Sequence, residues 1–192
     1  MKTLNSISNL KVLDLSTVLA GPSVGMFLAE LGASVVKIEH PSIPDVTRSW
    51  KLASEEKDSP VSAYFYSVNY GKTYLSLNLS READHKQFLE LVKDADILLT
   101  NFKLGDDRKL GLESKSLLKI NPRLIIGKIS GFGDQSDRVA YDLILQAETG
   151  FMSMNGTKDS GPIKMPVALI DVLAGHQLKE GILLALMERQ LT

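Results

Sequence analysis

Short apolar runs alternate along this chain with longer stretches whose apolar residues recur at helical spacing. The short apolar runs predict strands at 12–15, 35–38, 96–100 and 124–129, because they are too short for core-facing helices. The segment 73–79 alternates apolar and polar positions, which also predicts a strand. Helices are predicted at 23–31, 61–70, 80–93, 112–120, 142–152 and 171–191. Strands that alternate with helices predict an α/β domain, in which a mostly parallel sheet carries helices on both faces.

The segment 11–48 contains the clearest unit of this pattern: strand, turn, helix and second strand. Gly21 and Pro22 end the turn, and Pro22 suits the first position of a helix because its missing N–H would be unpaired there anyway. In a parallel sheet, ligands bind beyond the carboxyl ends of the strands. Function is therefore expected around Ser16–Pro22 and Glu39–Arg48.

A dinucleotide site at this first turn is one interpretation, because Glu39 follows the turn by about 20 residues, as such sites require. However, Gly21, Gly25 and Gly32 do not have the G-x-G-x-x-G spacing that holds a pyrophosphate. A dinucleotide-binding oxidoreductase domain therefore stays an alternative. So does a tight turn before the helix that binds no ligand.

Composition excludes several classes of function. The 192 residues have a formal net charge of -1, which gives no strong field for nucleic acid or an acidic membrane. The chain has no cysteine, so disulfides, thiolate nucleophiles and cysteine-based metal sites are excluded. The three histidines lack metal-ligand spacing, and no metal is expected; His85 is expected to be exposed. No apolar run is long enough to span a bilayer, and we expect a cytoplasmic protein.

Asp171 is the main candidate for catalysis. It follows the apolar run 167–170 and opens the last predicted helix, where an aspartate commonly caps the helix N-terminus. The same position stabilises a carboxylate that could attack an activated acyl group. Sequence spacing leaves both interpretations open. Cations follow several predicted strands and form either a phosphate-binding rim or ordinary surface charge: His40, Arg48, Lys72, Lys103, Arg108, Lys109 and Arg138.

The last predicted helix, 171–191, is apolar enough to need cover on both sides. No later element in the sequence can provide that cover. The domain is therefore expected to be incomplete and to associate through this helix.

Several segments, taken together and in order, resemble the class III coenzyme A transferases (the CaiB/BaiF family). They are VLDLSTVLAGPSVGMFLAELGASVVKIEHP, LSLNL, ADILLTNFKLG, KLGL, NPRLIIGKISGFG, YDLILQAETGFM and IDVLAGHQLKEGILLAL. The resemblance runs from about Lys11 to Arg189. It implies a Rossmann-like large domain of which residues 1–192 form the N-terminal, CoA-binding part, without the small domain of the family.

The resemblance implies an enzyme that moves CoA between an acyl-CoA thioester and a carboxylic acid. Asp171 would be the nucleophile, passing through a mixed anhydride and an aspartyl-CoA thioester. His40 would lie near the adenine and ribose-phosphate end of CoA. The full set of implied CoA contacts is Leu19, Ala20, His40, Leu77, Asn78, Leu79, Ser80, Asn101, Phe102, Lys103, Lys109, Arg138 and Tyr141. The implied partner is a second copy, in an interlocked homodimer, or a separately encoded second half.

Two residues depart from the family pattern. Racemases of the family carry histidine at the place of Tyr141, which favours a transferase over an α-methylacyl-CoA racemase-like enzyme. Some relatives carry glutamine at the place of Leu19, so the acyl substrate stays open. The chain is also shorter than family members, which implies weak or no turnover alone and leaves a non-catalytic CoA-binding subunit of a split enzyme as an alternative.

Overall fold

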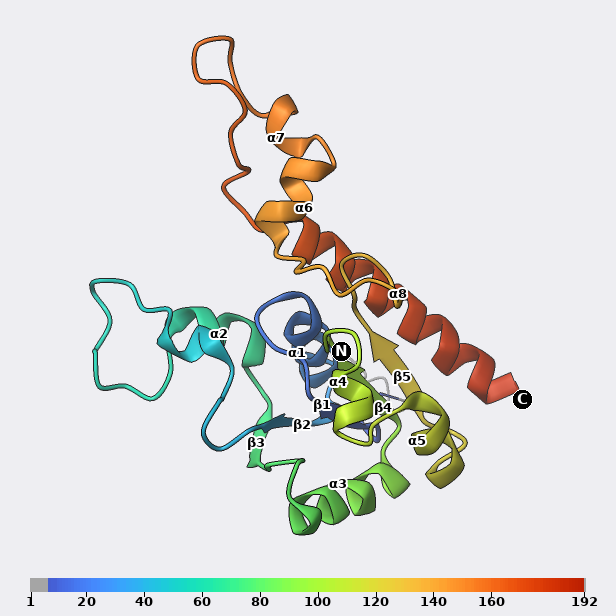
Figure 1. The fold of residues 1–192 in the computed structure, drawn as a ribbon. Coiled ribbons are helices and arrows are strands. Elements are labelled where there is room, and N and C mark those ends of the chain that lie inside the picture. The colour runs from blue at the N-terminus through green and yellow to red at the C-terminus, as the bar shows by residue number, and fades with distance from the viewer. Residues whose placement is uncertain (1–6, 192) are drawn as a thin grey trace.

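A five-stranded parallel sheet forms the centre of the computed structural model, which describes residues 7–191 (Figure 1). The strands lie in the order β3-β2-β1-β4-β5, and every neighbouring pair is parallel. This confirms the predicted α/β fold. Since the order reverses between β1 and β4, the loops after these two strands diverge and leave a crevice. The strands are β1 Lys11–Asp14, β2 Ser34–Glu39, β3 Thr73–Ser76, β4 Ile97–Thr100 and β5 Ile125–Lys128.

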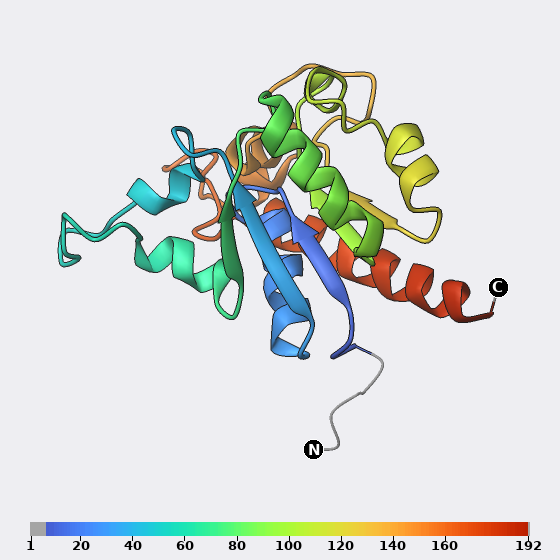
Figure 2. The ribbon, with the colours of Figure 1, turned by 90° about the horizontal axis from the view of Figure 1, so that it is seen from below.

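Helices cover both faces of the sheet, as Figure 2 shows for α3 and α8. Successive side chains of a strand point to opposite faces. Leu98 of β4 therefore packs with α3 and α5, while Ile97 and Leu99 pack with α1 and α8. The helices are α1 Ala20–Glu30, α2 Ala63–Asn69, α3 Glu82–Asp94, α4 Asp106–Lys109, α5 Ser114–Ile120, α6 Asp142–Glu148, α7 Phe151–Met154 and α8 Leu169–Leu191, and η1 Val46–Ser49 is a 3₁₀ turn.

Several predicted boundaries were wrong, and local geometry explains them. The first helix begins at Ala20 rather than residue 23, because the chain turns sharply at Val18, whose φ is 73°. Pro22 is consequently the third helical residue. Its missing N–H is still harmless there, since the first-turn amides have no partner within the helix. The helix predicted to begin at residue 80 begins at Glu82, and Arg81 before it makes no side-chain capping bond.

The predicted helix 142–152 is instead two helices. Gly150 adopts a φ of 86°, which ends α6 and turns the chain into α7. The connections at 41–60 and 101–111, which lie between predicted elements, contain the short elements η1 and α4. His85 is half-buried rather than exposed, and its Nε2 atom is enclosed beside Gly111 without a hydrogen-bond partner among residues 7–191.

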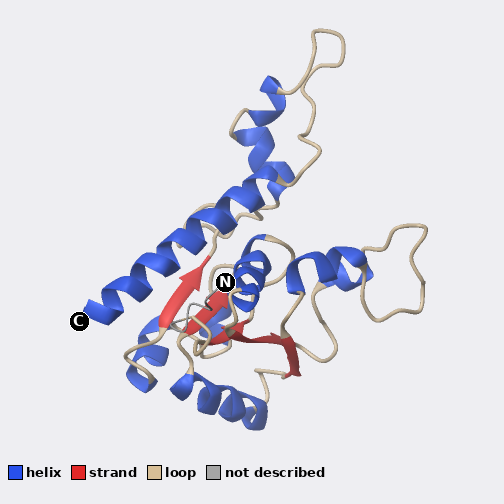
Figure 3. Cartoon of the chain, turned by 180° about the vertical axis from the view of Figure 1, so that it is seen from behind, coloured by secondary structure: helices blue, strands red, loops and turns tan. Residues whose placement is uncertain are grey.

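Residues 142–168 form an arm that extends beyond the sheet, and α8 returns from this arm along the sheet face (Figures 1 and 3). Gly175 lets α8 approach α1 closely: an added Cβ would lie 3.0 Å from Ala20 O and 2.6 Å from Ser23 Oγ. Ile182 is buried against the sheet, whereas Leu184 and Met187 on the same helix are exposed. The helix thus packs on one side and presents apolar side chains on the other. Between residues 7 and 191, no helix is both long and apolar enough to cross a membrane.

Candidate functional site

Two adjoining cavities lie at the carboxyl edge of the sheet. The larger encloses about 290 Å³ between the turn after β1, the loops after β4 and β5, and the start of α8, where Asp171 contributes to its wall. The smaller encloses about 180 Å³ at the ends of β1, β2 and β3, and Glu39 and His40 line it. Thr17 and Phe102 line both cavities. A ligand that follows this edge could therefore occupy both.

The larger cavity has a strained turn in its wall. Val18 is the one residue other than glycine with positive φ in the part of the chain that the structure describes. A β-branched residue in this conformation costs roughly 1–3 kcal/mol, and such strain persists only where the surroundings impose it. Asn101 at the end of β4 imposes part of it. Its side chain accepts a hydrogen bond from Thr17 N (3.0 Å) and donates one to Thr17 O (2.8 Å).

A buried ion pair between Lys72 and Asp14 lies next to the turn after β1. Lys72 Nζ lies 2.7 Å from Asp14 Oδ2, and it also donates to Pro22 O and Asn69 Oδ1 at 2.8 Å each. Burial alone would raise the pKa of the Asp14 carboxyl, but the ammonium groups of Lys72 and Lys37 outweigh it and the net pKa is lowered. Burial lowers the pKa of Lys72 to about 8 against the opposing effect of Asp14. The pair therefore ties β1, α1 and α2 together.

Asp171 is the third residue of α8, not its N-cap. The capping role falls to Asp142, the first residue of α6, whose Oδ1 accepts from Ile170 N (2.7 Å) and Asp171 N (3.3 Å). Within residues 7–191, no side chain donates a hydrogen bond to the Asp171 carboxylate. Burial and, to a lesser extent, the Asp142 carboxylate raise the pKa of Asp171 to about 6. Asp171 thus presents a carboxylate to the cavity without being needed as the cap.

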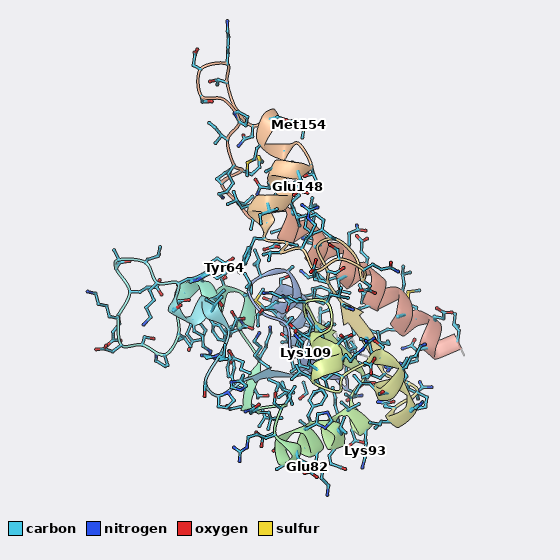
Figure 4. All side chains as sticks on the ribbon, in the orientation of Figure 1. Tyr64, Glu82, Lys93, Lys109, Glu148 and Met154 are labelled. Atoms are coloured by element: carbon cyan, nitrogen blue, oxygen red, sulfur yellow. The ribbon has the colours of Figure 1, made fainter. Side chains whose placement is uncertain are left out.

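Tyr64 of α2, labelled in Figure 4, lies close enough to this carboxylate for the two groups to interact electrostatically. Burial raises the pKa of its phenol, and so do the nearby carboxylates of Asp171, Asp45 and Asp142. The Trp50 ring meets the Tyr64 ring edge-on, with 5.2 Å between centroids. The aromatic pair is therefore near Asp171, although neither ring lines either cavity.

Most of the predicted site residues are brought together at these cavities. Those in the larger cavity are Leu19, Ala20, Asn101, Phe102, Lys103, Arg138, Tyr141 and Asp171. Those in the smaller are His40, Leu77, Asn78, Leu79 and Ser80, with Phe102 shared between the two. Lys109 lines neither cavity. It lies on α4 (Figure 4), with its ammonium 3.0 Å from Asp106 Oδ1.

Other cations of the predicted phosphate rim are also engaged elsewhere. Arg48 pairs with Glu39 at 2.5 Å and covers the ring of Phe65. Arg108 pairs with Glu113, and Lys72 is buried with Asp14. Arg138 does line the larger cavity, where its guanidinium lies 3.9 Å above the Phe132 ring and pairs with Glu148.

Sequence reasoning missed several residues in and around the cavities, of which Lys128, Tyr64 and Asp142 carry polar groups near the site. Lys128, at the end of β5, lines the larger cavity, with its ammonium 2.9 Å from Asp134 and 4.0 Å from Asp107. Its place at the end of a predicted strand was a usable signal. Tyr64 and the capping role of Asp142 had no comparable signal, because each depends on residues far away in the sequence. The described residues contain no group of three histidine or acidic side chains placed to hold a metal ion.

Comparison with known proteins shows which family shares this sequence. The model of CoA-transferase family III matches residues 7–192. The chain is 37% identical to the succinyl-CoA:mesaconate CoA-transferase of Haloarcula marismortui, over 98% of this chain and 50% of that protein. It is 37% identical to the succinate–glutarate CoA-transferase of Agrobacterium fabrum, over 88% of this chain and 44% of that protein. The chain therefore spans about half the length of the curated relatives it matches.

Comparison of the fold with solved structures points to the same family as the sequence comparison. A CaiB/BaiF family protein from Brucella suis superposes with a TM-score of 0.87 at 37% identity, covering 96% of this chain and 50% of that one. The family match over residues 7–192 includes all five strands and the residues that line both cavities. The chain belongs to CoA-transferase family III.

Proposed function

We propose that this chain binds coenzyme A along the carboxyl edge of its sheet and provides the nucleophile of a CoA-transferase. The observation that carries the proposal is Asp171, a carboxylate in the wall of the larger cavity with a pKa raised to about 6 and no side-chain donor from the described residues. At neutral pH this carboxylate is mainly ionised. It is also more basic than an ordinary aspartate, which favours nucleophilic attack.

The reaction begins with attack by one Asp171 oxygen on the thioester carbonyl carbon of an acyl-CoA. The carbon–sulfur bond breaks, CoA leaves as a thiolate, and a mixed anhydride joins Asp171 to the acyl group. The thiolate then attacks the Asp171 carbonyl carbon, which releases the acyl group as a carboxylate and leaves an aspartyl-CoA thioester. The same two steps in reverse, with an incoming carboxylic acid, give the new acyl-CoA and free Asp171.

The two cavities divide the binding of CoA between them. His40 in the smaller cavity accepts a hydrogen bond on Nδ1 from Ser42 N (3.1 Å), so the proton of its neutral ring lies on Nε2. That N–H can donate to the phosphate or adenine end of CoA. Lys103, Lys128 and Arg138 line the larger cavity and could contact phosphate oxygens, Lys128 and Arg138 alongside their carboxylate partners Asp134 and Glu148. The pantetheine arm would then lead the thioester past Phe102 towards Asp171.

The first test is binding, measured by calorimetric titration of the chain with CoA, acetyl-CoA and NAD⁺. The proposal requires binding of CoA or acetyl-CoA without binding of NAD⁺. Binding of NAD⁺ alone would contradict it and would restore a dinucleotide-binding oxidoreductase domain. Alanine at Lys93, an exposed residue of α3 that lines neither cavity, serves as a surface control.

The second test concerns Asp171. Incubation with acetyl-CoA or succinyl-CoA and hydroxylamine should convert an acylated Asp171 into its hydroxamate, detectable by peptide mass spectrometry. Asp171→Asn should abolish that product and leave CoA affinity within about twofold. CoA binding without any trapped product would instead favour a non-catalytic CoA-binding subunit. The acyl substrates, and a second copy or second half that would complete the enzyme, belong to the same proposal.

A further inference from the structure

The turn after β1 is held by side chains at four consecutive backbone groups. Asn101 bonds both the N–H and the carbonyl of Thr17. The remaining two groups belong to the neighbours of Thr17. The carbonyl of Ser16 accepts a hydrogen bond from the ammonium of Lys37, and the N–H of Val18 donates to Asp45 Oδ2 at 3.0 Å. The strained conformation of Val18 is therefore imposed by Asn101 after β4 and by Lys37 and Asp45 in and after β2.

Lys37 and Asp45 also bind each other, with 3.2 Å between Nζ and Oδ2, and both side chains are completely buried. A buried ion pair adds little net stability, because removing two charges from water costs about as much as their attraction returns. Stability alone therefore gives a weak reason for a pair in this place. Its geometry gives a stronger one, since each charge contacts one end of the same turn.

Asp45 lies where the two cavities meet. It lines the smaller cavity, while the turn that it holds lines the larger one. Its N–H donates to Glu39 Oε1 at 2.9 Å, and its Oδ1 accepts from Thr47 N at 3.0 Å. The position of Asp45 is thus fixed by β2 and η1 rather than by the turn itself.

We infer that Asp45 is a positioning residue which, with Lys37 and Asn101, locks residues 16–18 in a strained conformation and so forms the wall between the two cavities before a ligand arrives. Preorganisation of this kind raises affinity because the ligand does not have to order the loop. The inference rests on the proposed function in one respect, that the ligand is CoA. Asp45 itself contacts neither the acyl group nor the nucleophile in this scheme.

The test compares Asp45→Ala with Asn121→Ala in the 192-residue chain. Asn121 is a matched control because it is also buried and bridges backbone groups, donating to Val92 O (2.9 Å) and Ala95 O (2.7 Å), but it lines neither cavity. Asp45→Ala should speed hydrogen exchange at the Val18 amide and weaken CoA binding by about tenfold or more. Asn121→Ala should change stability without either effect.

A double variant separates positioning from stability. Lys37→Met with Asp45→Ala removes both charges, so no unpaired ammonium stays buried and stability should exceed that of Asp45→Ala alone. CoA affinity should nevertheless stay low, because the turn remains unlocked. If affinity recovers together with stability, Asp45 has only a structural role and the inference is overturned.

Failure of the proposed function would look different. In that case the wild-type chain would bind neither CoA nor acetyl-CoA. Hydrogen exchange at the Val18 amide would then test, without any ligand, whether Asp45 holds residues 16–18 in place. Slow exchange in the wild type and fast exchange in Asp45→Ala would support this role of Asp45. Equal rates in the two proteins would overturn it.

Discussion

Replacing Asp171 with asparagine should stabilise this fold at neutral pH. Burial, followed by the Asp142 carboxylate, raises the pKa of Asp171 from 3.8 to about 6. The folded state therefore favours the protonated, uncharged group. Asparagine has nearly the same shape and carries no charge, so it removes the cost of ionising a carboxyl in this place. A stability gain from this change would mark a residue kept for chemistry rather than for folding.

The sign and size of the effect follow from this pKa. Between about pH 4 and pH 6 the folded state binds more protons than the unfolded state, so stability falls as pH rises through this window. The loss is complete above about pH 6. The difference in pKa corresponds to roughly 3 kcal/mol. Because the side chain is partly exposed, solvent screening reduces the expected gain of Asp171→Asn to about 1–2 kcal/mol at pH 7.

Urea unfolding of the wild-type and Asp171→Asn chains at pH 4 and pH 7 measures this effect. The variant should be more stable at pH 7, and the difference should nearly vanish at pH 4. Glu82→Gln is a suitable control, since Glu82 is an exposed acidic residue in the first turn of α3. There the charge favours the helix dipole, so its removal should cost a few tenths of a kcal/mol. A loss of stability at pH 7 for Asp171→Asn would refute the reasoning.

Three further changes test the packing around the site by thermal or urea unfolding. Ile182→Ala, in the buried side of α8, should cost about 2–5 kcal/mol by opening a cavity; a cost below 1 kcal/mol would mean that α8 does not pack as described. Gly175→Val should destabilise the contact of α8 with α1, because even a Cβ meets Ser23 Oγ at 2.6 Å, and an unchanged melting temperature would contradict that approach. Lys72→Met should cost about 3–5 kcal/mol by leaving the Asp14 carboxylate buried and unpaired, and Asp14→Leu in the same chain should recover part of the loss.

The sheet was predictable because its signal is local. Short, largely apolar runs mark strands that are buried on both faces, and the runs predicted as strands at 12–15, 35–38, 96–100 and 124–129 each overlap a strand of the structure. The apolar run 167–170 leads into α8 instead. Helix starts were less predictable, since they depend on distant contacts. Asp142 caps α8 from 28 positions away in the sequence, so the local pattern assigned the cap to Asp171.

The candidate site was predictable to the extent that it follows the strand ends. Residues that directly follow β2, β3 and β4 gathered at the cavities because the carboxyl ends of parallel strands share one edge. The cations were predicted less well. Lys109 and Arg108 each form an ion pair with a nearby carboxylate, Asp106 and Glu113 respectively. The sequence does not show which acid lies within 4 Å of a given ammonium or guanidinium group.

The two ends of the site depend on different parts of the chain. The smaller cavity is formed by strand ends and by residues that directly follow them, so it depends mainly on the central sheet. The start of α8 depends instead on the arm: Asp142 caps it, and Gln146 links Asp142 to Val167 O and Met165 N. This arm extends beyond the sheet, with Glu148 and Met154 far from the strands (Figure 4). A change in the arm, such as Gln146→Ala, should therefore lower the yield of the Asp171 hydroxamate in the hydroxylamine trapping experiment. CoA affinity should stay near that of the wild type.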